Sequence, residues 1–474
     1  MWPQFLLRLL VVFFVVNLVV IGYVAFKIKA FEKTSIEITP RGYSSLISTV
    51  KEVVSKNKKD LTGEDSERIN ILLLGMGGEG HSGQYLTDTI ILASVNPQNY
   101  DAALIGIPRD LYVKIPETKV YTKINAVYTY GRNSNYEKPI EPVKKVVEEI
   151  TGEPIDYYLT IDFEGFKKII DELGGIIIQV ENDIVDYKYP GPGRSYETFK
   201  IEKGTHLVNG DVALKYARVR HVSGGDFSRL KRQQEIISAA KRRALSLENF
   251  VNPIKLTNLL GILEENIQTD IQLDEIPAFI EIFKNINTYN MNTRVLDAWS
   301  PNSLLAVSHV LLGNVNAFIL VPRTGNYQEI HYLVSNIFHL DKLEKAQERI
   351  TEEAANVVLV TPSCQNPAQI KNIFSKMGYK ISVKEDFSLA SYCQDKTVIL
   401  TENKDKIYTL NDLSTKFNAE IKEGVKNDYS ADVVLCFPER EINKLGDQIN
   451  QLSADEFDGG DILDNDGNIL YNQN

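Results

Sequence analysis

The stretch 209–243 carries the densest group of side chains that could bind an anion. Arg218 and Arg220 stand two positions apart in a segment that we expect to be extended, so both would point to one face of a strand. Arg229 and Gln233 stand four positions apart, which is one turn of a predicted helix over 230–247. They continue the apolar stripe of that helix, so we expect both side chains to point into a cleft.

Two shorter segments add carboxylates and further cations. Asp88 lies in a Thr-Asp-Thr sequence at the mouth of a predicted strand, and Arg109 and Asp110 follow the proline that ends another strand. Lys123 opens a segment that we expect to become a helix. Taken alone, Asp88 could cap a turn, and Arg109 with Asp110 could form an ordinary surface ion pair.

Converging arginines with nearby aspartates suit a ligand that carries phosphate. Guanidinium groups bind phosphate oxygens as a fork, and carboxylates can hold Mg²⁺ against the same oxygens. Phosphoryl transfer depends mainly on positioning and on neutralisation of charge, so such a site could be catalytic without a Ser/His/Asp triad. Nucleic-acid binding is the rival interpretation, and the net charge of -11 argues against it.

The glycines of 75–80 fit the spacing G-x-G-x-x-G, which is typical of a dinucleotide site. That site needs a helix to begin at the glycines, so that its N-terminus faces the phosphates. Here the chain continues into a second predicted strand at 89–95, and no Gly-Lys-Ser/Thr sequence follows. We therefore interpret the glycines as a flexible loop between two strands.

Strands and helices alternate in the elements that position these residues. Apolar runs predict strands over 69–74, 89–95, 102–107 and 176–180. Asp162 is a plausible N-cap for a helix that ends at Gly174 and Gly175. A strand is also expected over 317–321. This order indicates an α/β or α+β sandwich.

The N-terminus predicts a membrane anchor. Residues 9–26 form an uncharged apolar run, long enough to cross a hydrocarbon core of about 30 Å as a helix. A cleaved signal peptide is the alternative, but no small-residue cleavage site follows. The cations Lys27, Lys29 and Lys33 outweigh Arg8, which by itself would place the bulk of the chain in the cytoplasm. Long domains cross the membrane largely regardless of charge, so this count decides little.

The sequence predicts several domains in a chain of 474 residues. They are a short cytoplasmic end with the anchor at 1–27, a spacer at 28–68, a large domain at 69–338, a linking helix at 339–355, a small α/β domain at 356–438 and an acidic, disordered tail at 439–474. The cysteines Cys364, Cys393 and Cys436 have no zinc-ligand spacing. Cys364 with Cys393 could close a disulfide outside the cytoplasm, or all three could be reduced and buried.

In this order behind one membrane helix, the clusters resemble the LytR-CpsA-Psr (LCP) family. The matching segments are LTDTIIL, IPRDLYV, KINAVYTYG, DYYLTIDFEGFKKIIDELGGI and NGDVALKYARVRH with GDFSRLKRQQEII. The resemblance runs from about residue 69 to 338, and 356–437 is similar to the LytR C-terminal domain. It implies an α/β fold with a mixed central sheet sandwiched by helices, a small C-terminal α/β domain and one N-terminal transmembrane helix.

The resemblance implies a magnesium-dependent phosphotransferase held by a single span in the bacterial cytoplasmic membrane, with most of the chain outside. Such enzymes move a glycopolymer from a polyprenyl-pyrophosphate carrier to peptidoglycan, and a pyrophosphatase side activity is compatible with the same site. A muramic acid hydroxyl attacks the sugar-linked phosphate, and polyprenyl phosphate leaves. The partners are then the lipid-linked glycan, peptidoglycan and the membrane, with no nucleic acid.

The family's site residues carry over to matching positions in this sequence. Asp88 matches a Mg²⁺ ligand, and Arg109, Arg218, Arg220 and Arg229 match arginines that clamp the pyrophosphate. The remaining matches, with polar or less defined roles, are Asp110, Lys123, Asp226 and Gln233. We expect Arg109, Asp110, Arg220 and Asp226 to be catalytic, and Lys123 and Gln233 to join the arginines in binding pyrophosphate.

One position departs from the family pattern. Many members have a second metal-binding aspartate where Gly77 stands, so we expect Glu79 to replace it as a ligand, with His81 or water and the pyrophosphate as the alternatives. A function of another class also fits the sequence. The protein would then be a non-catalytic, membrane-anchored binder of polyprenyl-linked glycan or peptidoglycan, or a transcriptional attenuator.

Overall fold

The computed structural model describes most of the chain from Leu61 onward. The described residues are 61–64, 66, 68–81, 83–134, 136–190, 195–219, 232, 236, 239–240, 243, 266–272, 275–286, 292–300, 303–312, 315–364, 366–386, 392–402, 404–425, 429–442, 445, 462–463 and 469–471. The chain divides into two compact units. The first is Met1–Gln84, Asp88–Leu104 and Ile155–Thr293, and the second is Tyr85–Thr87, Ile105–Pro154 and Arg294–Asn474.

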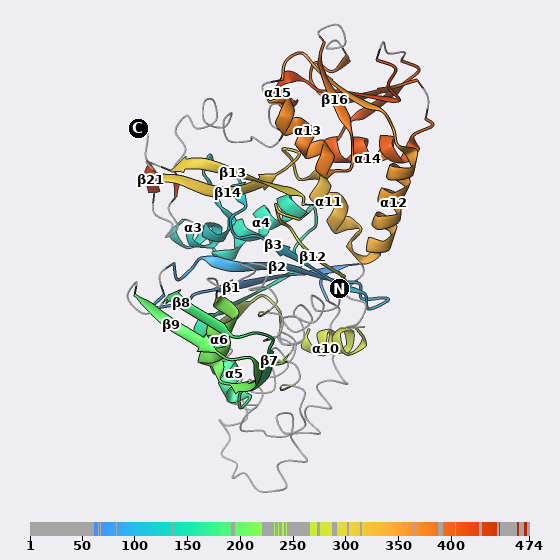
Figure 1. The fold of residues 1–474 in the computed structure, drawn as a ribbon. Helices are drawn as coiled ribbons and strands as arrows, with labels where there is room; N and C mark the ends of the chain where they lie inside the picture. Colours follow the sequence, from blue (N-terminus) through green and yellow to red (C-terminus); the bar gives the residue numbers. More distant parts are fainter. Residues whose placement is uncertain are drawn as a thin grey trace, which may run out of the picture. The chain divides into compact units, whose positions relative to one another are not determined.

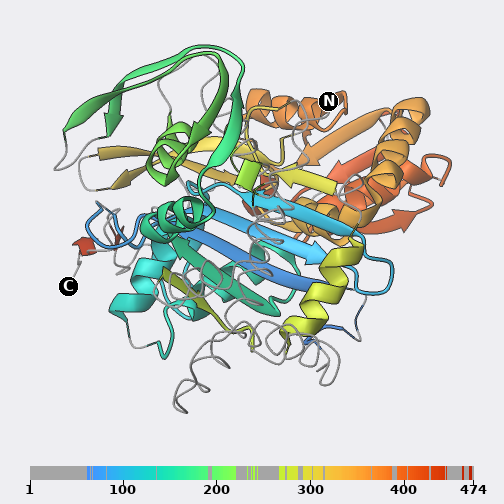
Figure 2. The same cartoon turned by 90° about the horizontal axis from the view of Figure 1, so that it is seen from below.

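A six-stranded sheet with the strand order β11-β6-β1-β2-β3-β12 has most of its residues in the first unit. Its strands are β1 (Ile69–Met76), β2 (Thr87–Val95), β3 (Ala102–Ile107), β6 (Tyr157–Asp162), β11 (Ile267–Thr269) and β12 (Asn292–Val295). β1 and β6 are parallel, whereas β6 and β11 are antiparallel. Strands β1, β2 and β3 lie side by side in Figures 1 and 2. The mixed central sheet confirms the predicted α/β class.

Both faces of this sheet are buried, as the apolar runs predict. On β1, Ile71 and Leu73 pack in one cluster with Phe279 of α10 (Ile276–Asn285). The alternate residues Leu72 and Leu74 are also almost completely buried. A strand that is buried on both sides reads as a continuous apolar run rather than an alternation, which is the pattern in INILLLGM.

A second core of the first unit follows β6. Its elements are α5 (Phe163–Glu172), β7 (Ile176–Val180), β8 (Ile184–Pro190), β9 (Tyr196–Ile201), β10 (Gly204–Val208) and α6 (Gly210–Arg218). The Asp162 side chain accepts a hydrogen bond of 2.7 Å from the Gly165 amide, which confirms the expected N-cap of α5. Asn209 caps α6 in the same way through the Val212 amide. β7 pairs with β10 in an antiparallel arrangement, and every second residue of β7 is buried.

The second unit begins with short strands and helices. They are β4 (Tyr112–Lys114), β5 (Tyr121–Lys123), η1 (Ile124–Ala126), α3 (Val127–Asn133), α4 (Ile140–Thr151), β13 (Leu305–Leu312), β14 (Val315–Pro322), α11 (Gln328–Ser335), η3 (Ile337–His339) and α12 (Leu340–Glu353). β13 and β14 form an antiparallel hairpin, and Ile319 and Val321 of β14 pack against Tyr112 of β4. The expected strand at 317–321 lies within β14.

A five-stranded sheet with the order β16-β15-β19-β17-β18 follows in the second unit. Its elements are β15 (Val357–Thr361), α13 (Pro367–Lys376), β16 (Ile381–Glu385), β17 (Val398–Thr401), α14 (Ile407–Phe417), β18 (Glu420–Glu423), β19 (Val433–Cys436) and α15 (Glu439–Ile442). β17 runs antiparallel to β19, whereas β15 is parallel to β16 and β19, and β17 is parallel to β18. The strand–helix alternation expected over 356–437 is therefore present.

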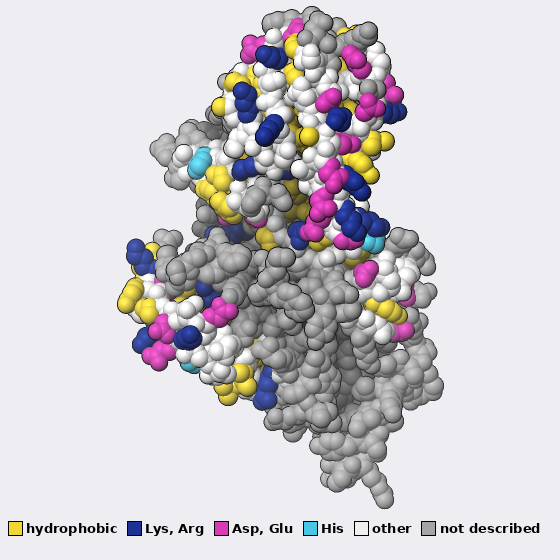
Figure 3. All heavy atoms as spheres, turned by 45° about the vertical axis from the view of Figure 1, so that its right-hand side comes forward, with side chains coloured by type: hydrophobic (Ala, Val, Ile, Leu, Met, Phe, Trp, Pro, Cys, Tyr) yellow, Lys and Arg dark blue, Asp and Glu magenta, His cyan; other side chains and the backbone are white. Residues whose placement is uncertain are grey.

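The two outer strands of this sheet carry charged side chains. Lys384 and Glu385 lie on β16, and on β18 Glu420 and Glu423 form ion pairs with Lys396 and Lys404. On the face shown in Figure 3, the cationic and anionic side chains of the described residues are interspersed over the molecule. Charged edge strands discourage pairing with a further strand.

The two ends of the chain differ in what the structure describes. The predicted membrane segment 9–26 lies outside the described residues, so it stays a prediction. Among the residues that are described, no helix has the length and apolar character to span a bilayer. Within the tail that we expect to be disordered, the structure has α15 and two strands, β20 (Ile462–Leu463) and β21 (Ile469–Tyr471). β20 pairs in parallel with β5.

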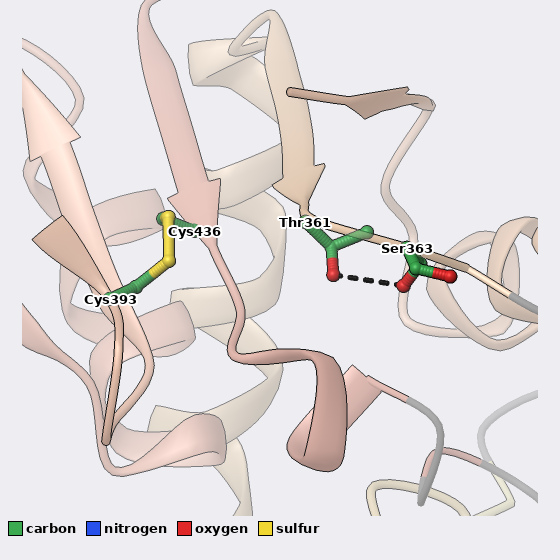
Figure 4. Close-up of a disulfide and its surroundings, with 4 residues drawn as sticks. All are labelled: Thr361, Ser363, Cys393 and Cys436. Atoms are coloured by element: carbon green, nitrogen blue, oxygen red, sulfur yellow. Dashed lines mark hydrogen bonds between the residues drawn. A yellow bond between two sulfur atoms is a disulfide. The ribbon is translucent and has the colours of Figure 1, made fainter. Parts of the chain in front are cut away.

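The disulfide joins Cys393 to Cys436, with Cα atoms 5.8 Å apart (Figure 4). Two states were considered from the sequence, a disulfide between Cys364 and Cys393 and three reduced thiols. Both are therefore wrong. Cys436 is the last residue of β19, and in the sheet it lies opposite Val398 of β17. Cys393 lies just before β17. Strand pairing thus brings these two cysteines together, whereas Cys364 follows β15 and is free.

A buried group of charges packs α11 against α14 in the second unit. The Arg323 guanidinium donates two hydrogen bonds of 2.7 Å to the Glu329 carboxylate, and both side chains are at most 5% exposed. The Lys416 Nζ atom lies 3.8 Å from the same carboxylate and 2.7 Å from Asp412. The Tyr379 hydroxyl donates to Asp412. Four buried or nearly buried charges therefore compensate one another.

We expect Glu329→Gln to lower the free energy of unfolding by about 3–5 kcal/mol, because it leaves the buried Arg323 without its counter-ion. Urea unfolding followed by circular dichroism measures this change. The matched control is Glu344→Gln, which removes an exposed pair with Arg294 and should change the free energy by no more than about 1 kcal/mol. Equal effects of the two substitutions would contradict the assignment.

Removal of the disulfide should also destabilise the protein. The bond closes a loop with a sequence separation of 43 residues, for which the chain-entropy relation gives about 4 kcal/mol. Thermal unfolding should therefore occur at a lower temperature in Cys393→Ser and in Cys436→Ser. Cys364→Ser, which removes the free thiol, should unfold as the unsubstituted protein does. A similar loss in all three variants would show that thiol packing, not the cross-link, matters.

Candidate active site

Arg109, Asp110 and Lys123 form one cluster in the second unit. The Lys123 Nζ atom lies 2.7 Å from Asp110 Oδ1, and the Arg109 Nε atom lies 3.5 Å from Asp110 Oδ2. The three side chains are 17–29% exposed, so they are neither buried nor free in solvent. Two cations therefore lie beside one carboxylate. The ion pair considered from the sequence exists, but it belongs to this larger cluster.

Backbone hydrogen bonds fix the cluster in place. The Leu320 amide of β14 donates to the Asp110 carbonyl at 2.9 Å, and the Ile124 amide donates to the Leu111 carbonyl at 2.8 Å. The antiparallel pairing of β4 with β5 sets Tyr112 opposite Lys123. Both cations and the carboxylate therefore come from short segments whose backbone partners are already satisfied, and a ligand would meet them preorganised.

Arg218 lies on α6, in the first unit, and not in an extended stretch. The prediction of a strand at this position is wrong, because an Asn209 cap begins a helix that continues to Arg218. The expected common face with Arg220 therefore does not follow. As a cation in the last turn, Arg218 also interacts favourably with the helix dipole.

Two aromatic rings hold the Arg218 guanidinium. Its central carbon lies 4.4 Å from the centroid of the Phe163 ring and 5.7 Å from that of Tyr189. The guanidinium also donates to the Tyr189 hydroxyl at 3.3 Å. Cation–π contacts satisfy a guanidinium face while its edge N–H groups stay available for oxygens. Sequence analysis missed both rings.

The glycine loop turns back between two strands, as the sequence analysis predicts. Gly78 and Gly80 have φ values of +81° and +82°, which favour glycine. A Cβ atom on Gly78 would lie 2.7 Å from the Cβ of Asp162, so the loop needs glycine for close approach as well. The Gly78 amide donates to the Gln84 carbonyl. No helix begins here, and the dinucleotide interpretation is excluded.

His81 of this loop lies beside the Arg218 site. Its ring meets the Phe163 ring edge to face, with centroids 5.2 Å apart. Burial lowers the pKa of His81, and the positive charges of Arg218 and Lys167 lower it further. The imidazole is therefore neutral near pH 7 and can accept a hydrogen bond.

The two expected metal ligands are both exposed carboxylates. Asp88 is the second residue of β2, and Glu79 lies in the glycine loop. Among the described residues, no three His, Cys, Asp or Glu side chains gather closely enough to hold a metal. Mg²⁺ commonly takes one or two carboxylates together with water and substrate phosphates, so an exposed Asp88 fits this ion. Glu79 as its partner stays a prediction.

The other expected residues lie outside the described part of the chain: Arg220, Asp226, Arg229 and Gln233. Their neighbour Arg232 is described, and sequence analysis did not single it out. It is 5% exposed and donates to the backbone carbonyls of Tyr216 and Val219, at the C-terminal end of α6. Arg232 thus donates hydrogen bonds to carbonyl groups at the C-terminal end of the helix that carries Arg218. In the sequence, the charged residues around Arg232 make this buried arginine look like a surface residue.

Comparisons with known proteins agree on one family. Residues 37–312 match the LytR_cpsA_psr family. The chain is 29% identical over 345 residues to the polyisoprenyl-teichoic acid–peptidoglycan teichoic acid transferase TagV of Bacillus subtilis, covering 71% of this chain and 80% of that one. It is 29% identical over 252 residues to TagU of Bacillus cereus, covering 51% and 76%.

Two further similarities are more partial. The regulatory protein MsrR of Staphylococcus aureus is 34% identical over 206 residues, which cover 43% of this chain and 57% of MsrR. The crystal structure of Bacillus subtilis TagV is 27% identical in sequence and covers 57% of this chain and 97% of its own, with a TM-score of 0.43.

The aromatic support of Arg218 can be tested with inorganic pyrophosphate. Phe163→Ala should weaken its binding by about three- to thirtyfold, because a partly desolvated cation–π contact is worth roughly 0.5–2 kcal/mol. Isothermal titration calorimetry measures the affinity. Phe163→Tyr keeps the ring and serves as the control. Unchanged affinity in Phe163→Ala would mean that the ring does not position Arg218 for an anion.

Proposed function

The chain belongs to the LytR_cpsA_psr family, and we propose that it is a phosphotransferase that moves a glycopolymer from a polyprenyl-pyrophosphate carrier to peptidoglycan. The main support is the similarity to TagV, whose name describes a transfer of teichoic acid to peptidoglycan and whose length is matched over 80%. The cations Arg109 and Lys123, which Asp110 holds in place, suit the pyrophosphate of such a carrier.

The proposed reaction is a displacement at phosphorus. A hydroxyl of the peptidoglycan acceptor forms a bond to the sugar-linked phosphorus, and the bond to the bridging oxygen breaks so that polyprenyl phosphate leaves. The hydroxyl proton passes to solvent. Arg109 and Lys123 bind the phosphate oxygens, and Asp110 orients both cations through its two carboxylate oxygens. Arg218 binds the same class of oxygen through the guanidinium edge that its aromatic partners leave open.

Magnesium is part of the proposal, with Asp88 as a ligand and Glu79 as the expected second one. When bound, the ion would neutralise charge on the pyrophosphate. The residues Arg220, Asp226, Arg229 and Gln233 are proposed to complete the site. Their expected roles rest on the family motif that 209–243 matches, since they lie outside the described residues.

We also propose that 9–26 anchors the protein in the bacterial cytoplasmic membrane, with most of the chain outside. The uncharged apolar sequence of this segment supports an anchor. The Cys393–Cys436 disulfide supports the orientation, because disulfides persist in oxidising compartments and are rare in the cytosol. A carrier lipid would then lie in the same membrane as the anchor.

The test uses the purified full-length protein with a synthetic polyprenyl-pyrophosphoryl glycan, peptidoglycan and Mg²⁺. Polyprenyl phosphate should be released, and glycan should become attached to peptidoglycan. Arg109→Ala should lower the rate about 10²–10³-fold, because it removes a cation aimed at developing charge. Arg109→Lys should recover only part of the rate, because an ammonium group cannot form the bidentate fork. Chelation of Mg²⁺ should abolish release.

Arg349→Ala is the matched control, because it removes an exposed arginine of α12 that, among the described residues, pairs with its neighbour Glu352. It should react as the unsubstituted protein does. Binding of the glycan without any release of polyprenyl phosphate, under all conditions, would contradict the transferase and support a non-catalytic binder.

A further inference from the structure

A cavity of about 470 Å³ opens at the C-terminal end of α3, in the second unit. Tyr130 and Asn133 of α3 line it, together with Ser134 and Tyr136, which follow the helix. The rings of Tyr130 and Tyr136 meet edge to face, with centroids 6.3 Å apart. Both rings are partly buried, so each is supported on one side and accessible on the other.

Close packing fixes the walls of this cavity. Tyr130 packs against the buried side chains of Ile115 and Val120. A Cβ atom on Gly131 would lie 2.4 Å from the Pro139 carbonyl oxygen, so only glycine lets the returning chain lie so close to α3. The segment that carries Ser134 and Tyr136 is thereby held between two fixed points, the end of α3 and Pro139.

The lining indicates the chemistry of a ligand. None of the four described lining residues is charged, and the nearby Lys145 ammonium is paired with Glu117, which disfavours a phosphate, since phosphate sites use arginine or lysine. A wholly apolar ligand would leave the Asn133 amide and the Ser134 hydroxyl without partners. Ring surfaces next to an amide and a hydroxyl fit a pyranose, which presents C–H groups on its faces and hydroxyls around its rim.

Glu117 and Lys145 act electrostatically on Tyr136 of this cavity. The Glu117 carboxylate lies 2.8 Å from the Lys145 ammonium. Glu117 holds a φ of +65°, an unfavourable conformation for a residue with a side chain, and such conformations concentrate at functional sites. Burial raises the pKa of Tyr136, and Tyr130 and Glu117 raise it further. The Tyr136 hydroxyl therefore stays protonated and can donate to a sugar oxygen.

The cavity is linked to the Asp110 cluster by one continuous helical segment. Lys123 of that cluster directly precedes η1, and η1 continues into α3, which ends at Asn133. At 2.0 Å per 3₁₀ residue and 1.5 Å per α residue, these ten residues span about 15 Å. A single sugar does not bridge this distance, whereas an oligosaccharide does.

We propose that Tyr130, Asn133, Ser134 and Tyr136 form a saccharide subsite, which binds a sugar of the glycan chain at a distance from the reacting phosphate. This inference rests on the proposed function and adds a chain-length preference to it. The sugar has two sources, the transferred glycopolymer or the peptidoglycan acceptor, and their pyranose chemistry is shared.

The test measures binding of lipid-free saccharides to the full-length protein by isothermal titration calorimetry. One arm uses muropeptide-free peptidoglycan oligosaccharides, and the other uses teichoic acid oligomers with their N-acetylhexosamine linkage sugars. Tyr136→Ala should weaken binding of the true source at least about tenfold, since loss of an aromatic contact and a hydrogen bond together is worth about 1.4 kcal/mol or more. Tyr136→Phe should retain most of the affinity because it keeps the ring.

Tyr408→Ala, at an exposed tyrosine of α14, is the matched control and should bind as the unsubstituted protein does. If neither arm shows binding, or if Tyr136→Ala and Asn133→Ala bind both saccharides normally, the subsite is wrong. Weakened binding in Tyr136→Phe equal to that in Tyr136→Ala would also overturn it, because stacking would then contribute nothing. Thermal unfolding of each variant shows whether the fold is intact.

Turnover separates this proposal from the proposed function. In the release assay, Tyr136→Ala should raise KM for a long saccharide substrate about tenfold, leave kcat unchanged and leave KM for a single-sugar substrate unchanged. Transfer with no dependence on Tyr136 would refute the subsite and leave the transferase standing. Saccharide binding that depends on Tyr136, in a protein that releases no polyprenyl phosphate, would refute the transferase and leave the subsite standing.

Discussion

The close approach of Asp162 to Gly78 is the constraint on which the surroundings of Arg218 in the first unit depend. Met76 of β1 lies opposite Asp162 of β6 in a parallel pair, so the two strands end together. Asp162 then caps α5, and Gly78 has no Cβ to collide with it. Strand end, helix start and loop are therefore fixed at one point, from which His81 and Phe163 extend to Arg218.

The candidate cations of the two units, each considered within its own unit, are held by two different physical means. Arg109 and Lys123 share the Asp110 carboxylate, which offsets their mutual repulsion. Among the described residues, no carboxylate pairs with Arg218, which rests on the rings of Phe163 and Tyr189. Aromatic support orients a guanidinium without neutralising it. A shared carboxylate and a pair of rings thus both fix the position of a cation.

Local patterns made much of the fold predictable. The apolar runs of β1 and β3 and the Asp162 cap of α5 are determined by residues close in sequence, and the structure has each of them. The spacing of Arg218 and Arg220 was misleading, because the Asn209 cap and the helical propensity of the residues after it decide the local structure. Among the site residues, Asp110 and Lys123 were singled out separately in the sequence, and the pairing of β4 with β5 brings them together.

Contacts between distant segments were not predictable in the same way. Phe163 and Tyr189 reach Arg218 from other elements of the fold, and nothing in their own neighbourhood marks them. The pairing of Cys393 with Cys436 follows from the order of β17 and β19, which the sequence does not reveal. Glu329 and Arg323 are close in sequence, but their burial depends on α14 packing over α11.

The charged outer strands of the five-stranded sheet limit how this protein can meet other chains. Among the described residues, each outer strand has one row of backbone amides and carbonyls with no neighbour in the sheet, and such a row can recruit a strand from another molecule. On β18 the row is flanked by Glu420 and Glu423 with their lysine partners. A strand that paired here would have to desolvate these charges. At high local concentration, copies of this protein would therefore not readily pair their edge strands into a shared sheet. Recognition of other molecules would then use side-chain surfaces.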